Sequence, residues 1–207
     1  MPQFHTKIMI VPVILESDKL HSHKERQYAG TIAADFYPRL IKQLLNIFNT
    51  LVTTINVYDS LMLDKGSTAN SRLFNNSKNQ WNSESILGWI SSKTLSNNDT
   101  KILAICDFDA YSNGLNFIFG EAQIGGRVGA IYLSRLRQEF YGLVSDVDLL
   151  QQRITKEAVH ELGHLFRLFH CERRNCVMHF SNSLHDTDFK DYYFCDRCIA
   201  LLFNMYQ

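Results

Sequence analysis

The residues best suited to chemistry are two histidines and a glutamate in HELGH, at positions 160 to 164. His160 and His164 lie four residues apart, so on an α-helix both imidazoles project from one face and can bind one zinc ion. Glu161 lies beside the first histidine and can take a proton from a zinc-bound water, whose pKa the metal lowers towards neutrality. Taken alone, this short motif is equally compatible with a helix that carries two ordinary histidines and a solvated glutamate.

The residues that follow make the metal interpretation much stronger. His170 lies six positions after His164 and completes H-E-x-x-H-x5-H, a three-histidine ligand spacing. Four of the five cysteines then gather in the C-terminal part of the chain, as C-x4-C and C-x2-C: Cys171, Cys176, Cys195 and Cys198. A secreted disulfide scaffold usually spreads its cysteines through the chain, so this tight set favours a second metal site.

The string HELGHLFRLFHCERRNCVM, with CDRC further on, resembles the archaemetzincins, a family of metzincin-type zinc metallopeptidases. Their pattern is H-E-x-x-H-x-x-G-x-x-H-C-x4-C-x-M, followed by a C-x-x-C pair. Sixteen residues separate Met178 from Cys195 here. The segments 114–136 and 71–87 are similar to the family more weakly, so the resemblance covers roughly residues 71–198.

This resemblance implies two zinc ions per chain, one catalytic and one structural. The catalytic ion would be bound by His160, His164 and His170, with Glu161 as the general base. Met178 would pack beneath the metal without binding it. The structural ion would be bound by the four cysteines, Cys171, Cys176, Cys195 and Cys198. The implied fold class is α/β: a metzincin-like mixed twisted β-sheet with packed helices, an active-site helix and a C-terminal cysteine-zinc loop. Val128–Leu133 would be the edge strand along which an extended peptide substrate pairs.

Arg167 stands where the family pattern has glycine. In an unbroken helix His170 would lie about 240° around the axis from His164, so the chain must leave the helix between them. Glycine adopts the left-handed conformation most cheaply, and arginine there costs about 1 kcal/mol. Three outcomes are open: Arg167 accepts the strain, the turn is rebuilt, or His170 binds metal poorly. The first two are favoured because His170 is retained.

Hydrophobic periodicity predicts the elements that position these residues. The predicted strands are Lys7–Leu15, Leu51–Tyr58, Lys101–Asp107, and a pair at Phe117–Phe119 and Val128–Leu133 around Gly125 and Gly126. The predicted helices are Tyr28–Phe48 with Pro38 starting or kinking it, Glu84–Lys93 capped by Ser83, Val144–Phe169 capped by Ser145 or Asp146, and Cys198–Tyr206. Leu61–Asn82 shows no clear period and is predicted to be irregular.

Composition narrows the function classes. The 207 residues are 45% hydrophobic and carry no formal net charge, with a pI near 7.1, so they predict one domain, 1–207, whose segment 171–207 is zinc-bound. This balance gives no support for nucleic-acid binding, and no apolar stretch is long enough to cross a membrane. The start of the chain lacks the features of a signal peptide, so a cytoplasmic protein is expected. A monomer is favoured.

The sequence therefore predicts a zinc metallopeptidase acting on peptides or proteins, and the resemblance suggests an aminopeptidase as one form. The alternative is a catalytically inactive, zinc-stabilised peptide- or protein-binding module, which the departure at Arg167 would explain. A zinc-ribbon-like nucleic-acid binder fits the cysteines but not the neutral charge. Several other residues are assigned ordinary roles: His179 and His185 as surface histidines, Glu121 and Arg127 as solvated charges, and Cys106 as a core residue.

Overall fold

A mixed β-sheet forms the centre of the computed structural model, which describes residues 6–16, 35–68, 70–94 and 99–205. Its strand order is β2-β1-β6-β9-β8, and β3 also pairs with β1. The strands are β1 (Thr6–Leu15), β2 (Val52–Val57), β3 (Leu61–Leu63), β6 (Thr100–Cys106), β8 (Gly120–Ala122) and β9 (Val128–Tyr132). All pairings in this sheet are parallel except that of β8 with β9.

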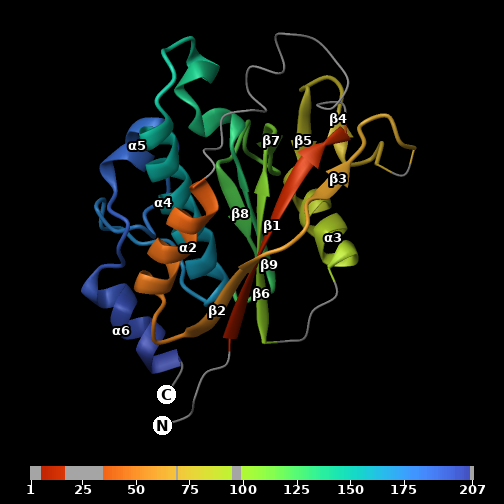
Figure 1. The fold of residues 1–207 in the computed structure, drawn as a ribbon. Helices are drawn as coiled ribbons and strands as arrows, with labels where there is room; N and C mark the ends of the chain where they lie inside the picture. The colour runs from red at the N-terminus through yellow and green to blue at the C-terminus, as the bar shows by residue number, and fades with distance from the viewer. Residues whose placement is uncertain (1–5, 17–34, 69, 95–98, 206–207) are drawn as a thin grey trace.

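Helices cover both faces of this sheet (Figure 1). One face packs against α2 (Phe36–Ile47) and α4 (Val147–Leu165), and the other packs against α3 (Ser83–Lys93). Alternate residues of β1 divide between the two cores: Ile8 and Ile10 face α2 and α4, whereas Met9 and Val11 face the opposite layer. A strand that is buried on both faces of a sheet has a continuous run of apolar residues in its sequence, and Lys7–Leu15 was predicted to be a strand from such a run.

The sheet edge differs from the prediction. Val128–Leu133 was expected to be the edge strand, but β9 pairs with β6 on one side and with β8 on the other. The resemblance implied the edge role for Val128–Leu133, and the pattern placed the preceding strand at Phe117–Phe119, just before the strand that forms. The strand that forms, Gly120–Ala122, is short, contains glycine and has no β-branched residue, so its composition gives little strand signal. Five consecutive buried residues in β9 fit its interior position.

Most predicted helices form with shifted ends. Pro38 lies in the first turn of α2, and the earlier part of that prediction, residues 28–34, falls outside the described residues. Asn82 caps α3, not Ser83, because its side chain accepts the N–H of Ser85. Asp146 caps α4 as expected, but the helix ends at Leu165, four residues before the predicted end.

Two further pieces of structure were not predicted. Part of Leu61–Asn82 forms β3 and two strands of a small second sheet, in which β4 (Phe74–Asn75) and β5 (Gln80–Asn82) join β7 (Ala110–Tyr111). In the C-terminal segment, α5 (Leu184–Phe189) precedes α6 (Asp196–Met205). Two 3-10 turns, η2 (Ser134–Leu136) and η3 (Gln138–Tyr141), lead towards α4. None of the helices in the described ranges is long and apolar enough to span a membrane.

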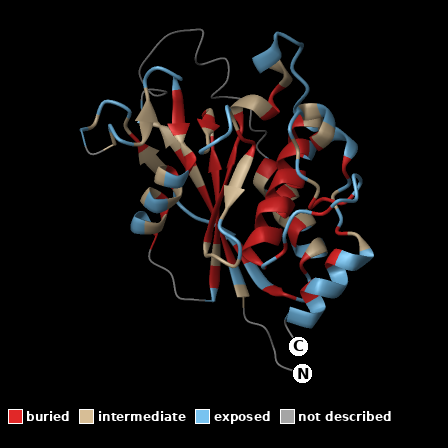
Figure 2. Ribbon diagram, turned by 180° about the vertical axis from the view of Figure 1, so that it is seen from behind, coloured by how far each residue is buried: buried red, intermediate tan, exposed pale blue. Residues whose placement is uncertain are grey.

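Figure 2 shows that α4 is buried along most of its length, between the sheet on one side and the C-terminal segment on the other. Its neighbours are the sheet edge at β8 and β9, helix α2 and helix α5. Because this helix carries the HELGH motif, the fold places the motif in the interior of the protein.

Candidate active site and metal centres

The end of α4 shows how His170 returns to the other two histidines. Arg167 has a φ of 70°, in the left-handed region. Its N–H donates to the carbonyl of His164, and the N–H of Leu168 donates to the carbonyl of Gly163. This pair of bonds is the Schellman arrangement that ends many helices, usually with glycine at the left-handed position. Of the three outcomes that the sequence left open, the structure shows the first: Arg167 accepts the strain.

Neighbouring residues accommodate this strained turn. Gly125 lies against the side chain of Arg167, and a Cβ added to Gly125 would lie 3.1 Å from the Arg167 Cγ. The N–H of Gly125 also donates to the carbonyl of His164, at 2.8 Å. Leu168, the residue after the left-handed position, is almost fully buried in the core cluster that packs against α4. The β8–β9 loop therefore supports the turn that carries His170.

The three histidines present their Nε2 atoms to one point. Nε2 of His164 lies 3.1 Å from that of His160 and 3.2 Å from that of His170. The Nδ1 atoms of His160 and His164 each lie 2.8 Å from a backbone carbonyl, of Val177 and Leu168 respectively. A carbonyl only accepts, so each Nδ1 carries the hydrogen and each Nε2 is left with a lone pair. Two facing lone pairs at 3.1 Å need a cation between them, and the triad therefore fits a metal ion.

Electrostatics keep these imidazoles neutral. Burial holds the pKa of His160 well below its usual range and also lowers that of His164. For His170, burial together with the neighbouring His164 lowers the pKa to about 4. The positive charge of Lys190 lowers all three pKa values further. A neutral imidazole is the form that binds zinc.

Glu161 is buried beside the triad and faces the sheet edge. Its Oε2 is buried and has no hydrogen-bond partner among the described residues. A Cβ added to Gly120 of β8 would lie 2.4 Å from Glu161 Oε1, so only glycine lets the edge strand approach the carboxylate this closely. Burial raises the pKa of Glu161 well above its usual range; Glu157 and Glu121 add to this, whereas Lys190 opposes it. A carboxylate with a raised pKa is a stronger base.

Met178 packs against Gly163, the glycine of the HELGH motif. It is fully buried, and a Cβ at Gly163 would lie 2.4 Å from its Sδ, so the glycine in HELGH makes room for it. The carbonyl of Met178 accepts the N–H of Cys171, at 2.9 Å. Because the preceding residue, Val177, accepts from His160, this turn connects the histidine site to the cysteine-bearing segment.

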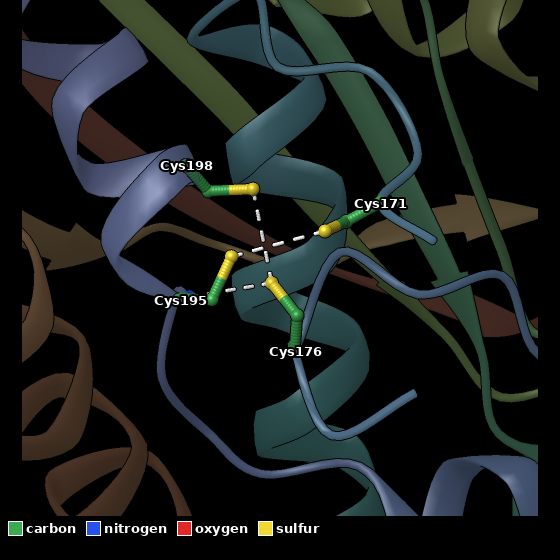
Figure 3. A group of neighbouring side chains, drawn as sticks. All are labelled: Cys171, Cys176, Cys195 and Cys198. Atoms are coloured by element: carbon green, nitrogen blue, oxygen red, sulfur yellow. Dashed lines mark hydrogen bonds between the residues drawn. The ribbon is translucent and has the colours of Figure 1, made fainter. Parts of the chain in front are cut away.

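The four C-terminal cysteines point to a common centre (Figure 3). Sγ of Cys171 lies 3.8 Å from that of Cys195, and the same distance separates Cys176 from Cys198. These distances exclude disulfides, in which the sulfurs lie about 2.05 Å apart. Four thiolates around a tetrahedral zinc, at about 2.3 Å each, lie about 3.8 Å from one another. The cluster therefore fits a structural zinc ion, and the triad fits a catalytic one.

Two of the five residues that were assigned ordinary roles occupy them fully, His185 at the surface and Cys106 in the core. His179 and His185 belong to neither ligand group, and Nδ1 of His179 donates to the carbonyl of Cys171. Cys106 is fully buried in β6. Arg127 is half-buried and donates to Ser91. Glu121 was expected to be a solvated charge, which is wrong: it lines the cleft, its Oε1 accepts from Ser112, and its Oε2 is buried.

A cleft of about 460 Å³ opens beside the triad. The segment 114–122, which ends in β8, lines this cleft, and so do Phe180, Ser181 and Asn182. The ring of Phe180 lies 5.0 Å from that of His170. Glu157, one helical turn before Glu161, also borders it. Sequence reasoning missed Gly120, Glu157 and the wall at 180–182. The spacing of Glu157 from Glu161 was a usable signal, because residues four apart share a helix face.

Comparisons with known proteins agree with this site. The profile of peptidase family M54 matches residues 38–204. Archaemetzincin of Methanocaldococcus jannaschii is 45% identical over 129 residues, covering 62% of this chain and 69% of that protein. Archaemetzincin of Pyrococcus abyssi is 53% identical over 100 residues. These residues cover 48% of this chain and 53% of that protein, so the chain spans about half the length of this relative. The crystal structure of archaemetzincin from Methanopyrus kandleri has a TM-score of 0.73 and 27% identity, over 98% of this chain and 97% of that one.

A profile match over most of the chain and relatives that share both sequence and fold lead to one conclusion: the chain belongs to the archaemetzincins, the metzincin-type zinc metallopeptidases of family M54.

Proposed function

We propose that this chain hydrolyses peptide bonds at the histidine site, with a zinc ion held by His160, His164 and His170 and with Glu161 as general base. The observation that carries the proposal is the position of Glu161, buried between the triad and Gly120 of the edge strand. Zinc bound there would supply a Lewis acid that polarises the scissile carbonyl and lowers the pKa of water towards neutrality.

Other residues of the cleft would bind the peptide and transfer the proton. Among the described strands β8 pairs only with β9, so its other edge can pair with an extended peptide through main-chain hydrogen bonds. Glu161 would accept the proton of the attacking water and pass it to the leaving amine. Binding through main-chain groups favours peptides as a class, and an aminopeptidase preference stays a prediction that N-terminally blocked peptides would test.

We also propose that the chain binds a second, structural zinc ion through Cys171, Cys176, Cys195 and Cys198, and that residues 1–207 act as one peptidase unit. A closed four-cysteine site has no open position for substrate, so its role would be to hold the segment from residue 171 onward. The segment that this site holds includes Met178 and the cleft wall at 180–182. Loss of the cysteine zinc would therefore disturb the cleft indirectly.

The inactive binding module is the weaker candidate. Its support came from Arg167, yet the left-handed conformation of that residue still brings Nε2 of His170 within 3.2 Å of that of His164. A peptide-library digestion with the Glu161→Gln variant tests the two candidates. We expect zinc to stay bound and hydrolysis to fall by roughly 100-fold or more, whereas Glu84→Gln, an exposed carboxylate on α3, serves as the matched control. Full activity of Glu161→Gln, or no cleavage by the unmodified chain, would contradict the proposal.

A further inference from the structure

A fully buried ion pair lies next to the cleft, and its two charges shift the pKa values of the histidines and of Glu161. Lys190 Nζ lies 2.9 Å from Glu157 Oε1, and their side chains are 0% and 4% exposed. The hydroxyl of Thr187, also fully buried, donates to the same oxygen at 3.1 Å. Glu157 borders the cleft one helical turn before Glu161. The pair therefore joins the active-site helix to the far end of α5.

The segment that Lys190 holds is the cleft wall. After Met178 the chain passes through Phe180, Ser181 and Asn182, which line the cleft, and then forms α5. Lys190 directly follows α5, and its Nζ also approaches the carbonyl of His179 at 3.5 Å. The ammonium group of Lys190 therefore contacts Glu157 of α4 and the carbonyl of His179. His179 and Lys190 are the two ends of the segment 179–190, so this one group links both ends to the active-site helix.

Other contacts also hold α5 on α4. Arg153 forms two bonds of 2.7 Å with the carboxylate of Asp188. Lys156 Nζ donates to the carbonyls of Thr187 and Asp188, at 3.1 and 2.8 Å. Neither Arg153 nor Lys156 lines the cleft. These contacts are expected to keep α5 in place when Lys190 is replaced, so a change there acts on the wall and not on the whole fold.

A buried ion pair is a poor means of stabilising a protein, because desolvation offsets most of the attraction. Its geometry, however, specifies one arrangement of the two segments it joins. We propose that Lys190 is a positioning residue: acting through Glu157, it fixes the wall Phe180–Asn182 against α4 and so sets the affinity of the cleft for peptide. The inference rests on the proposed peptidase function.

The test compares Lys190→Met with the unmodified chain, both loaded with zinc. We expect KM for peptide to rise about tenfold with kcat changed less than about threefold, and the amides of 179–183, before α5, to exchange hydrogen faster. Arg39→Met is the matched control, because it removes more exposed ion pairs, with Asp148 of α4 at 3.1 Å and with Asp35 at 3.2 Å. It should leave KM and the exchange of 179–183 unchanged. The hydrogen-exchange result needs no catalysis, so it tests the positioning role even if peptide hydrolysis is absent.

The double variant Glu157→Gln/Lys190→Met separates positioning from neutralisation of a buried carboxylate. Removing both charges should restore thermal stability, since no uncompensated charge stays in the interior. If Lys190 positions the wall, KM stays raised and exchange of 179–183 stays fast in the double variant. The inference would be overturned if KM and the exchange rate of the double variant returned to the values of the unmodified chain. It would also be overturned if Lys190→Met left KM and the exchange rate unchanged.

Discussion

The carboxylate of Glu161 lies against the backbone of Gly120, so closely that a methyl group on that glycine would fall 2.4 Å from Oε1. This contact joins the proposed general base on α4 to β8, the strand at the edge of the sheet. The packing of α4 on β8 therefore sets the distance between the proposed base and the proposed peptide-binding edge.

Replacing Gly120 with alanine should displace the base. The added Cβ cannot be accommodated without moving either the carboxylate or β8, and a shift of about 1 Å costs roughly 100-fold in kcat. Zinc content should not change, because the histidines are not touched. Steady-state kinetics with Gly88→Ala as control checks this, since a Cβ at Gly88 meets nothing within 4 Å. Equal kcat for Gly120→Ala and the unmodified chain would contradict the packing argument.

Arg167→Gly should make the protein more stable. Glycine removes the left-handed strain at φ 70°, so the free energy of unfolding should rise by up to about 1 kcal/mol. Arg167→Ala keeps the strain and loses the packing on Gly125, so it should be less stable than the unmodified chain. Urea denaturation of the three proteins measures both effects. A less stable Arg167→Gly variant would mean that the arginine side chain contributes more than its backbone costs.

The metal-free protein should lose stability in acid through its histidines. Their pKa values are lowered in the folded state, to about 4 for His170, whereas an unfolded histidine has a pKa near 6.5. Between these values the unfolded chain binds more protons, so stability falls as the pH falls from about 6.5 to about 4. Thermal unfolding in the presence of chelator checks this. His170→Asn should weaken the dependence in that window and the exposed His185→Asn should not; identical profiles for the two variants would exclude this cause.

The ligands could be predicted from sequence because their geometry is local. The spacing of His160 and His164 on a helix and the order of the cysteines determine which residues meet, and the structure brings both sets together. The fate of Arg167 could not be predicted, because it depends on support from Gly125 of a distant loop. The ion pair between Glu157 and Lys190 could not be predicted from sequence either, since a buried ion pair between distant residues leaves no periodic pattern. The edge strand β8 was missed because three residues with a glycine carry almost no strand signal.

Zinc stoichiometry tests the account most directly, because every role assigned to the histidine site depends on a metal bound there despite Arg167. Metal analysis would be made on the purified chain, on His164→Ala and on the pair Cys195→Ser/Cys198→Ser. The account predicts two zinc ions per chain, with each variant losing a different one and peptide hydrolysis lost in His164→Ala. A single zinc ion that is lost only with the cysteines would contradict it.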